Sequence, residues 1–371
     1  MNVDLKKIEK FINDLGQNMR THFKDFDLKN MEKNLKGIEF GTHGEQPMVP
    51  AFYGPEYNMI SIKEDISKFN YTEEELKYMI SHEFSHMAST RNAKSMFGLR
   101  SGLQRGGGFF MKNVAITEGL TEYVTREVTG LNIDMAYTFE RKCAEALITI
   151  LGDEFLQSYF DADSKSLYKY TNSLGISKKE MNELFDDMDN SLLWRNKSIK
   201  DMNNNIMPSK NNEYISNIEK KLVDIAARVG LRRNNDKESI ANMIHDIQKQ
   251  FIPLNLEFSK EDGNEEQFLS KYSNGLEDAF LYAKKMEDDI REGRITSEEQ
   301  IMPKKKSFFK RKQETLSLHS APNQDKVNKP NKWKADIKFE HNINNNVTEI
   351  NQENIQGDIK NKNHDNDDLT I

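Results

Sequence analysis

The chain has 371 residues, of which 30% are charged, and its formal net charge is −7 at pH 7. This negative balance disfavours a chain built as a whole to bind nucleic acid, and the single cysteine, Cys143, excludes an internal disulfide. No apolar run approaches the roughly 20 residues that cross a bilayer, and the first residues lack the apolar core of a signal peptide. We therefore expect a cytoplasmic protein.

The N-terminal part of the chain combines helical and strand patterns. Apolar residues at helical spacing predict a helix over 3–22, and a shorter helix is expected over 28–35. Short apolar runs separated by glycine and proline then predict strands at 38–40, 49–53 and 59–62. The chain is therefore expected to begin with a small strand-rich unit.

The next segment carries a helix start signal. Thr72 offers its hydroxyl as an N-cap and Glu75 completes a capping box, so a helix is predicted over 73–89. The glycine-rich stretch 96–112 predicts a loop or an irregular hairpin, and another helix is expected over about 117–128. A longer helix should follow and end near Gly152. Its apolar stripe comprises Tyr137, Ala144, Leu147, Ile148 and Leu151.

Composition divides the chain into four parts. Residues 1–195 are predicted to form one domain, 196–213 a linker or long loop, 214–295 a helical region, and 296–371 a disordered polar tail. The helices expected in the third part cover 214–229, 237–250 and 265–292.

The string His82-Glu83-Phe84-Ser85-His86 has a spacing with chemical meaning. Residues four apart share one face of a helix, so both imidazoles can give a nitrogen to one zinc ion at roughly 2.0–2.1 Å. Glu83 lies about 100° further round the helix, beside the ion rather than facing it. A carboxylate in that place can accept a proton from water that the zinc has made acidic.

A catalytic zinc site needs a third protein ligand. The pattern H-E-x-x-H-x-x-G-x-x-H is excluded, because Ser89 stands at its glycine position and Asn92 at its last histidine position. The other main choice is a glutamate from a second helix. The string Thr117-Glu118-Gly119-Leu120-Thr121-Glu122-Tyr123 offers two glutamates on one helical face, Glu118 and Glu122.

Together the two strings resemble the gluzincin metallopeptidases, the clan of thermolysin-like proteases and zinc aminopeptidases. The resemblance implies one Zn²⁺ ion held by His82, His86 and Glu118, with Glu122 as the hydrogen-bond partner of a zinc-binding histidine. The reverse assignment, with Glu122 as the ligand, stays open. The resemblance covers about residues 50–160. It departs from the clan at Thr117, where asparagine is usual, and the aminopeptidase motif G-x-M-E-N is absent, so the closest branch is not identified.

The resemblance also implies a fold and a reaction. The expected fold class is α+β, a zincin-like two-lobe metallopeptidase with a small strand-rich N-terminal lobe and a mainly helical C-terminal lobe. The expected reaction is zinc-dependent hydrolysis of peptide bonds in a peptide or protein substrate, with Glu83 as general base. Tyr137 is a candidate for the phenol that stabilises the oxyanion. Strand 59–62 is the candidate edge along which an extended substrate would lie.

Two other functions stay open. The chain could be a catalytically silent zinc-binding interaction module, although an intact Glu83 argues against this. It could also be a partner-specific or self-processing peptidase that is inactive on generic substrates. Outside the domain, Lys304–Lys312 combine six positive charges with two phenylalanines and could contact an anionic membrane surface. No nucleic-acid partner is expected.

Overall fold

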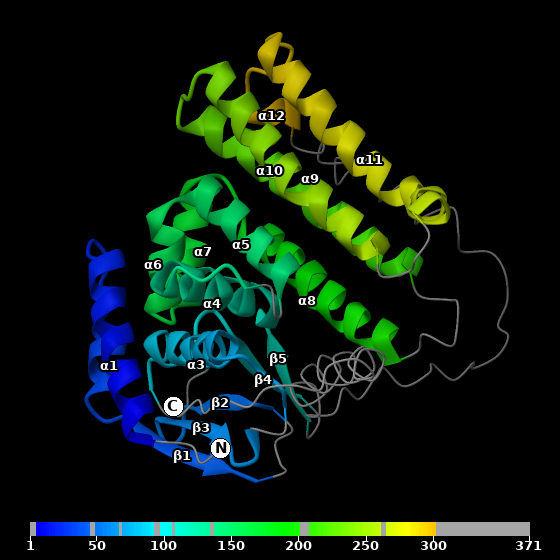
Figure 1. Cartoon of the computed structure of the whole chain (residues 1–371). Coiled ribbons are helices and arrows are strands. Elements are labelled where there is room, and N and C mark those ends of the chain that lie inside the picture. Colours follow the sequence, from blue (N-terminus) through cyan, green and yellow to red (C-terminus); the bar gives the residue numbers. More distant parts are fainter. Residues whose placement is uncertain are drawn as a thin grey trace, which may run out of the picture.

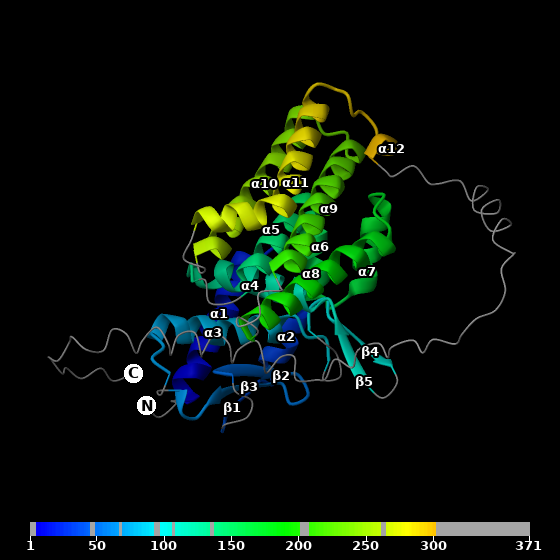
Figure 2. The same cartoon turned by 90° about the vertical axis from the view of Figure 1, so that its right-hand side faces the viewer.

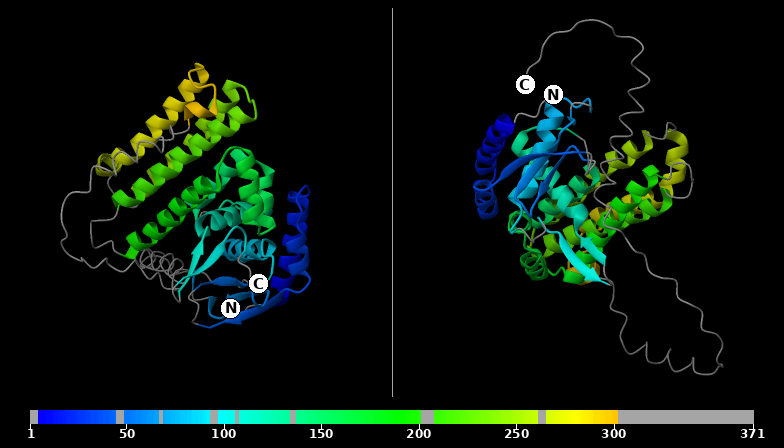
Figure 3. Two further views of the ribbon diagram at one scale, coloured as in Figure 1. Left: turned by 180° about the vertical axis from the view of Figure 1, so that it is seen from behind. Right: turned by 90° about the horizontal axis from the view of Figure 1, so that it is seen from below.

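The structure is a computed structural model that describes residues 5–44, 49–66, 69–92, 97–105, 108–133, 137–200, 208–260 and 265–301. It is a mixed α+β fold in which helices predominate. A small three-stranded sheet lies at one end, and layers of helices follow it towards the other end (Figure 1). The view from behind shows the same order, with the sheet and the last long helices on opposite sides of the central helices (Figure 3, left).

The three-stranded sheet contains all three predicted strands, namely β1 (Glu39–His43), β2 (Ala51–Gly54) and β3 (Met59–Lys63). β3 is central, because β1 pairs with it in parallel and β2 pairs with it in antiparallel. The prediction that strand 59–62 forms an edge is therefore wrong. Its consecutive residues Ile60, Ser61 and Ile62 are all buried, so both faces of the strand are covered, and β1 and β2 form the edges.

Helices α1 (Leu5–His22), α2 (Lys29–Leu35) and α3 (Glu73–Ala88) agree with the predicted helices. The apolar stripe of α1 is buried, which explains why its spacing could be read from the sequence. The capping box of α3 is confirmed: Thr72 Oγ1 accepts from the Glu75 N–H at 3.2 Å, and Glu75 Oε2 accepts from the Thr72 N–H at 2.7 Å. α3 packs on β2 and β3 on one side and on α4 on the other.

The glycine-rich stretch forms an antiparallel hairpin, β4 (Ser101–Arg105) and β5 (Gly108–Lys112), which projects from the helices (Figure 2). Helix α4 (Val114–Thr129) follows at once and starts earlier than predicted. The reason lies far away in sequence. The Asp189 carboxylate accepts the backbone N–H groups of Asn113 and Ala115, each at 2.8 Å, and so caps the first turn.

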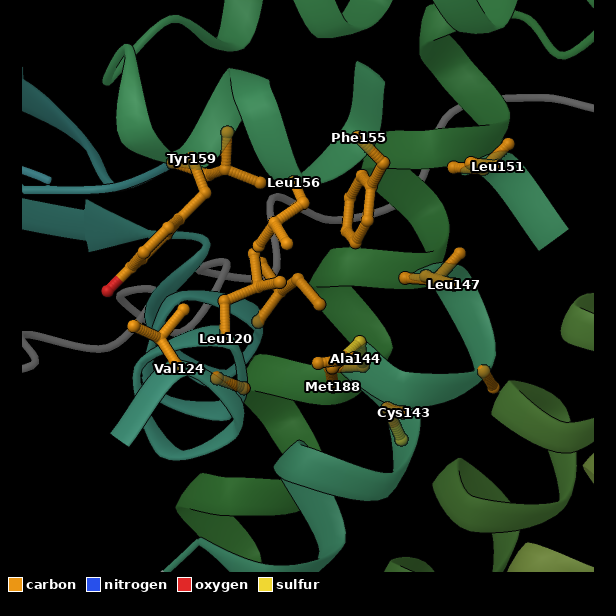
Figure 4. Close-up of a cluster of buried hydrophobic side chains, with 14 of the residues drawn as sticks. Leu120, Val124, Cys143, Ala144, Leu147, Leu151, Phe155, Leu156, Tyr159 and Met188 are labelled. Atoms are coloured by element: carbon orange, nitrogen blue, oxygen red, sulfur yellow. The ribbon is translucent and has the colours of Figure 1, made fainter. Parts of the chain in front are cut away.

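The centre of the molecule is helical. It consists of α5 (Thr138–Leu151), α6 (Asp153–Phe160), α7 (Ser164–Ser173) and α8 (Lys178–Lys200). Apolar side chains of α4, α5, α6 and α8 meet in one cluster, and the Tyr159 hydroxyl points out of it (Figure 4). A Cβ at Gly119 would lie 2.2 Å from the Glu140 carbonyl oxygen, so glycine is what lets α4 and α5 approach this closely.

The last long helices are α9 (Pro208–Arg232), α10 (Lys237–Lys260) and α11 (Glu265–Arg291), followed by the short α12 (Glu298–Ile301). α9 packs on α5 and α8, and the described apolar residues of α9–α11 belong to the same hydrophobic cluster as those of α1–α8. The region 214–295 is thus joined to the first domain by a shared core. α8 and α9 also extend into the segment 196–213 that was predicted as a linker.

Two predictions for the end of the chain fall outside the described residues. The tail was predicted to begin at 296, but the described chain continues as α12 to Ile301, and residues 302–371 lie beyond it. The basic segment Lys304–Lys312 is among those residues. Within the described ranges, no helix is both long and apolar enough to cross a membrane.

Candidate metal centre

His82 and His86 project from α3 towards α4, one helical turn apart. Their ring centroids are 4.7 Å apart and the ring planes are nearly perpendicular. His86 is buried and His82 is nearly so, with 12% of its side chain exposed. The spacing predicted from the sequence therefore brings the two imidazoles to one place, because residues four apart on a helix share a face.

Glu118, on the facing turn of α4, completes the group. Its Oε2 lies 3.2 Å from His82 Nε2 and 3.5 Å from His86 Nε2. One ligand atom from each of the three residues lies within 4.8 Å of the other two, and the group could hold a metal ion. Glu122 is not a member of this group, which places Glu118 rather than Glu122 with the two histidines.

The other nitrogen of each imidazole also has a defined partner. His82 Nδ1 lies 2.9 Å from Glu122 Oε1, and Glu122 Oε2 accepts a hydrogen bond from the Tyr78 hydroxyl. His86 Nδ1 lies 3.3 Å from Thr121 Oγ1, whose own proton goes to the Thr117 carbonyl. Both Nδ1 atoms therefore face acceptors, which leaves the two Nε2 atoms directed at Glu118.

The charges in the site follow from these contacts. Burial lowers the pKa of His86 to about 4, so this imidazole is neutral, as a metal ligand must be. Burial would raise the pKa of Glu118, but the charge of Arg100 and the hydrogen bond from His82 outweigh it and hold that pKa well below its usual range. Burial likewise opposes a charged His82, yet its hydrogen bonds to Glu118 and Glu122 raise its pKa well above the usual value. Without a metal ion, the site therefore retains a proton on His82.

Small hydroxyl side chains line the contact between α3 and α4. Ser85 Oγ lies 3.1 Å from Thr125 Oγ1, and the Tyr159 hydroxyl lies 2.9 Å from Thr121 Oγ1. The short Ser85, Thr121 and Thr125 side chains let α3 and α4 approach closely, and each of these three hydroxyls donates to a main-chain carbonyl. This close approach is what brings a glutamate of α4 within reach of both histidines of α3.

Glu83 occupies a different position from its neighbours in the string. Its Oε2 accepts the backbone N–H of Tyr53, in β2, at 2.7 Å. Because β2 is an edge strand, this hydrogen bond shows that its unpaired side faces Glu83 of α3. The sequence predicted a carboxylate beside the histidine pair, and the structure directs it towards the sheet edge.

Tyr137 is brought to the site, although it does not lie on the helix where its apolar stripe had placed it. It precedes α5 as the N-cap residue, with a left-handed backbone at φ 55°. Its ring stacks on His82, with centroids 6.0 Å apart and an interplanar angle of 16°. A non-glycine residue in this conformation is uncommon, and the surrounding structure must hold it there.

Sequence reasoning missed four side chains that complete the site. Tyr78 and Thr121 each lie about one turn from a predicted site residue, so helical periodicity would have found them. Phe97 packs on the His86 ring at 4.1 Å, and Arg100 pairs with Glu118 Oε1. These last two lie in an irregular segment, where no periodic signal exists.

The geometry thus gives a buried group of two imidazoles and a carboxylate that could hold a metal ion, while the Glu83 carboxylate is hydrogen-bonded to β2. Comparisons of the chain with protein family models, with curated proteins and with solved structures find no match.

Proposed function

We propose that this chain is a zinc metallopeptidase of the gluzincin type, in which His82, His86 and Glu118 hold the ion and Glu83 is the general base. The observation that carries the proposal is the position of Glu83. It adjoins a member of the metal-binding group in sequence, and its carboxylate is hydrogen-bonded to the edge strand β2. A group that bound metal only for structure would need no carboxylate in that place.

The donor set fits zinc. Two imidazole nitrogens and one carboxylate oxygen are the ligands of one common class of catalytic zinc site, which keeps a fourth position open. Bound there, zinc would polarise the scissile carbonyl and lower the pKa of water at the site. The ionised Glu118 and neutral His86 are already in the protonation states that binding requires.

Glu83 would carry the proton through the reaction. As the oxygen of a water molecule attacks the scissile carbonyl carbon, Glu83 accepts a proton from that water. As the carbon–nitrogen bond breaks, Glu83 delivers the same proton to the nitrogen of the leaving amine, so atoms and charges balance. The hydrogen bond from the Tyr53 N–H fixes the carboxylate for this role.

The edge of β2 is the place where an extended substrate would lie. Tyr53 presents its N–H to Glu83 rather than to β3, so this side of β2 is not used within the sheet. A peptide added along it would pair with main-chain groups of β2 other than the Tyr53 N–H, a mode that fixes register without demanding particular side chains. This replaces β3, which is central and cannot accept another strand.

The sheet with α3 and the helices beginning with α4 would be the two lobes of a zincin-like enzyme. Tyr137, stacked on His82, is the candidate donor to the developing oxyanion. Substituting Tyr137 by phenylalanine should then lower kcat more than it changes KM.

The substitution Glu83→Gln tests the reaction. Wild type and variant are loaded with zinc, and their cleavage of a whole-proteome peptide and protein mixture is compared by mass spectrometry. We expect cleavage to fall by about 10²–10⁴-fold with zinc content unchanged, because only the base is lost. The matched control is Glu9→Gln, an exposed glutamate on α1, which should leave cleavage unchanged. Full activity in Glu83→Gln would refute the role of the base.

The same screen decides between this function and the two alternatives. Wild-type protein that binds zinc but cleaves nothing would support a non-catalytic metal-binding module. Cleavage confined to a few proteins, or to the chain itself, would support a partner-specific or self-processing peptidase. Broad cleavage that disappears in Glu83→Gln would support a general peptidase.

A further inference from the structure

The two carboxylate oxygens of Glu118 have different partners. Oε2 faces both histidines, whereas Oε1 accepts a hydrogen bond from Nη2 of Arg100. The Arg100 and Glu118 side chains are each only 3% exposed, so this is a buried ion pair rather than a surface contact. A buried pair of this kind is costly to desolvate and is therefore not expected without a reason.

The segment before Arg100 is tightly anchored. Phe97 forms an isolated bridge with Thr90, and the Gly98 N–H donates to the Ser89 carbonyl at 2.9 Å. Gly98 has φ +57°, and a Cβ there would lie 2.7 Å from Thr117 and 2.8 Å from Tyr159. Only glycine allows the backbone to come this close to Thr117 and Tyr159, so the chain at Gly98 packs directly on α4 and α6.

The next two residues direct the guanidinium into the site. Asn113 Nδ2 donates to the Leu99 carbonyl at 2.9 Å, which ties the backbone to the start of α4. The guanidinium carbon of Arg100 then lies 4.1 Å from the centroid of the Phe97 ring, a cation–π contact. Arg100 is therefore clamped between an aromatic face and Glu118, by residues of the segment itself and of α4.

We propose that Arg100 is a positioning residue that occupies Oε1 of Glu118, so that a metal ion binds this glutamate through Oε2 alone. A carboxylate can give a metal one oxygen or two, and the second oxygen would use the position that a catalytic zinc site keeps open. Hydrogen bonds to the remaining atoms of a ligand are the usual means by which proteins orient it. This inference depends on the proposed metal centre but not on the proposed hydrolysis.

Cobalt(II) is the probe, because its visible absorption is strong when it has four ligands and weaker when it has more. Wild type, Arg100→Met and Arg100→Lys are titrated with Co²⁺ as full chains. We expect one Co²⁺ per chain in each, with weaker bands in Arg100→Met because the released Oε1 also binds the ion. Arg100→Lys, which keeps a cationic donor, should restore much of the wild-type intensity. The matched control is the exposed Arg91→Met, which should give the wild-type spectrum.

Several results would overturn the proposal. They are an Arg100→Met spectrum equal to that of wild type, an equal loss of intensity in Arg100→Lys, or no Co²⁺ binding by wild type. If Arg100→Met does not fold, a crystal structure of the zinc-loaded wild type decides instead. Glu118 bound through Oε2 with Arg100 on Oε1 supports the proposal, and both oxygens on the metal refutes it. Altered spectra without any peptide cleavage would leave this inference standing and refute only the peptidase.

Discussion

Two buried glutamates, in different regions of the molecule, have opposite chemistry. Glu118 in α4 and Glu219 in α9 are both 2% exposed. The pKa of Glu118 is held well below the usual range, because Arg100 and the hydrogen bond from His82 outweigh the effect of burial. The pKa of Glu219 is raised to about 7 by burial, which Lys220 offsets only slightly.

The difference shows that burial alone does not decide the charge of a carboxylate. Around Glu118 the fold gathers two imidazoles and a guanidinium from α3 and from the segment before β4. Around Glu219 burial is offset only slightly by Lys220, so the neutral form is favoured below about pH 7. The first environment keeps its carboxylate ionised below neutral pH as well, and a metal site needs that anion.

The substitution Glu118→Gln should give the largest effect on stability. It removes the carboxylate that faces Arg100 and His82 inside the protein, and breaking a buried pair in this way costs about 3–5 kcal/mol. The free energy of unfolding of the metal-free protein in urea measures the loss. The matched control is Glu32→Gln in the exposed Arg20–Glu32 pair, where about 0–1 kcal/mol is expected. Equal losses in both variants would remove the contrast between buried and exposed pairs.

The same substitution at Glu219 should have the opposite sign. Because its folded pKa of about 7 lies above the ordinary 4.5, wild-type stability should fall as pH rises from about 4.5 through about 7. Glutamine has no such titration, so Glu219→Gln should be more stable than wild type at about pH 8, by up to about 3 kcal/mol, and similar at about pH 4. Urea unfolding of both proteins at the two pH values measures this. A difference that does not change with pH would contradict the account of Glu219.

Tyr78→Phe probes the contacts behind His82. The phenol donates to Glu122, which in turn accepts from His82 Nδ1, and Tyr78 is only 1% exposed. Losing a hydrogen bond to a buried charged group should cost about 1.5–3 kcal/mol, while the metal-binding group itself stays intact. Thermal or urea unfolding, together with the zinc content, checks both parts. A neutral effect on stability would mean that this contact does not support the site.

Thr72→Ala should have the smallest effect. It removes the N-cap of α3 at an exposed position away from the charged group, for a loss of about 1 kcal/mol. The loss should be the same at every pH that leaves the fold intact, unlike that of Glu219→Gln. Urea unfolding measures it, and a changed zinc content in this variant would show that the cap also positions the histidines.

The parts of the fold that could be predicted are those with a sequence signal inside a single helix or strand. The capping box at Thr72 and the apolar stripe of α1 lie within single helices, and both predictions are confirmed. The central place of β3 depends on how three strands are ordered, which the strands themselves do not encode. The early start of α4 depends on Asp189 in α8. Tyr137 lies outside α5 because its backbone adopts a left-handed conformation.

The same distinction between local signals and contacts between distant segments holds for the site. His82, Glu83 and His86 are close in sequence, so helical spacing alone was enough to group them. Grouping Glu118 with them required the packing of two helices, which only the family resemblance suggested in advance. The Arg100 side chain is directed into the site by the backbone at Gly98 and by Asn113. No sequence motif around Arg100 predicts this role.

Zinc content tests most directly whether His82, His86 and Glu118 form a metal centre. It is measured in the wild type, Glu83→Gln and Glu118→Gln after equal loading and removal of weakly bound metal. We expect about one ion per chain in the wild type and in Glu83→Gln, because His82, His86 and Glu118 are intact in both. We expect little or no zinc in Glu118→Gln, measured on protein that still unfolds cooperatively. A full equivalent of zinc in Glu118→Gln, or none in the wild type, would contradict the claim that these three residues form a metal centre.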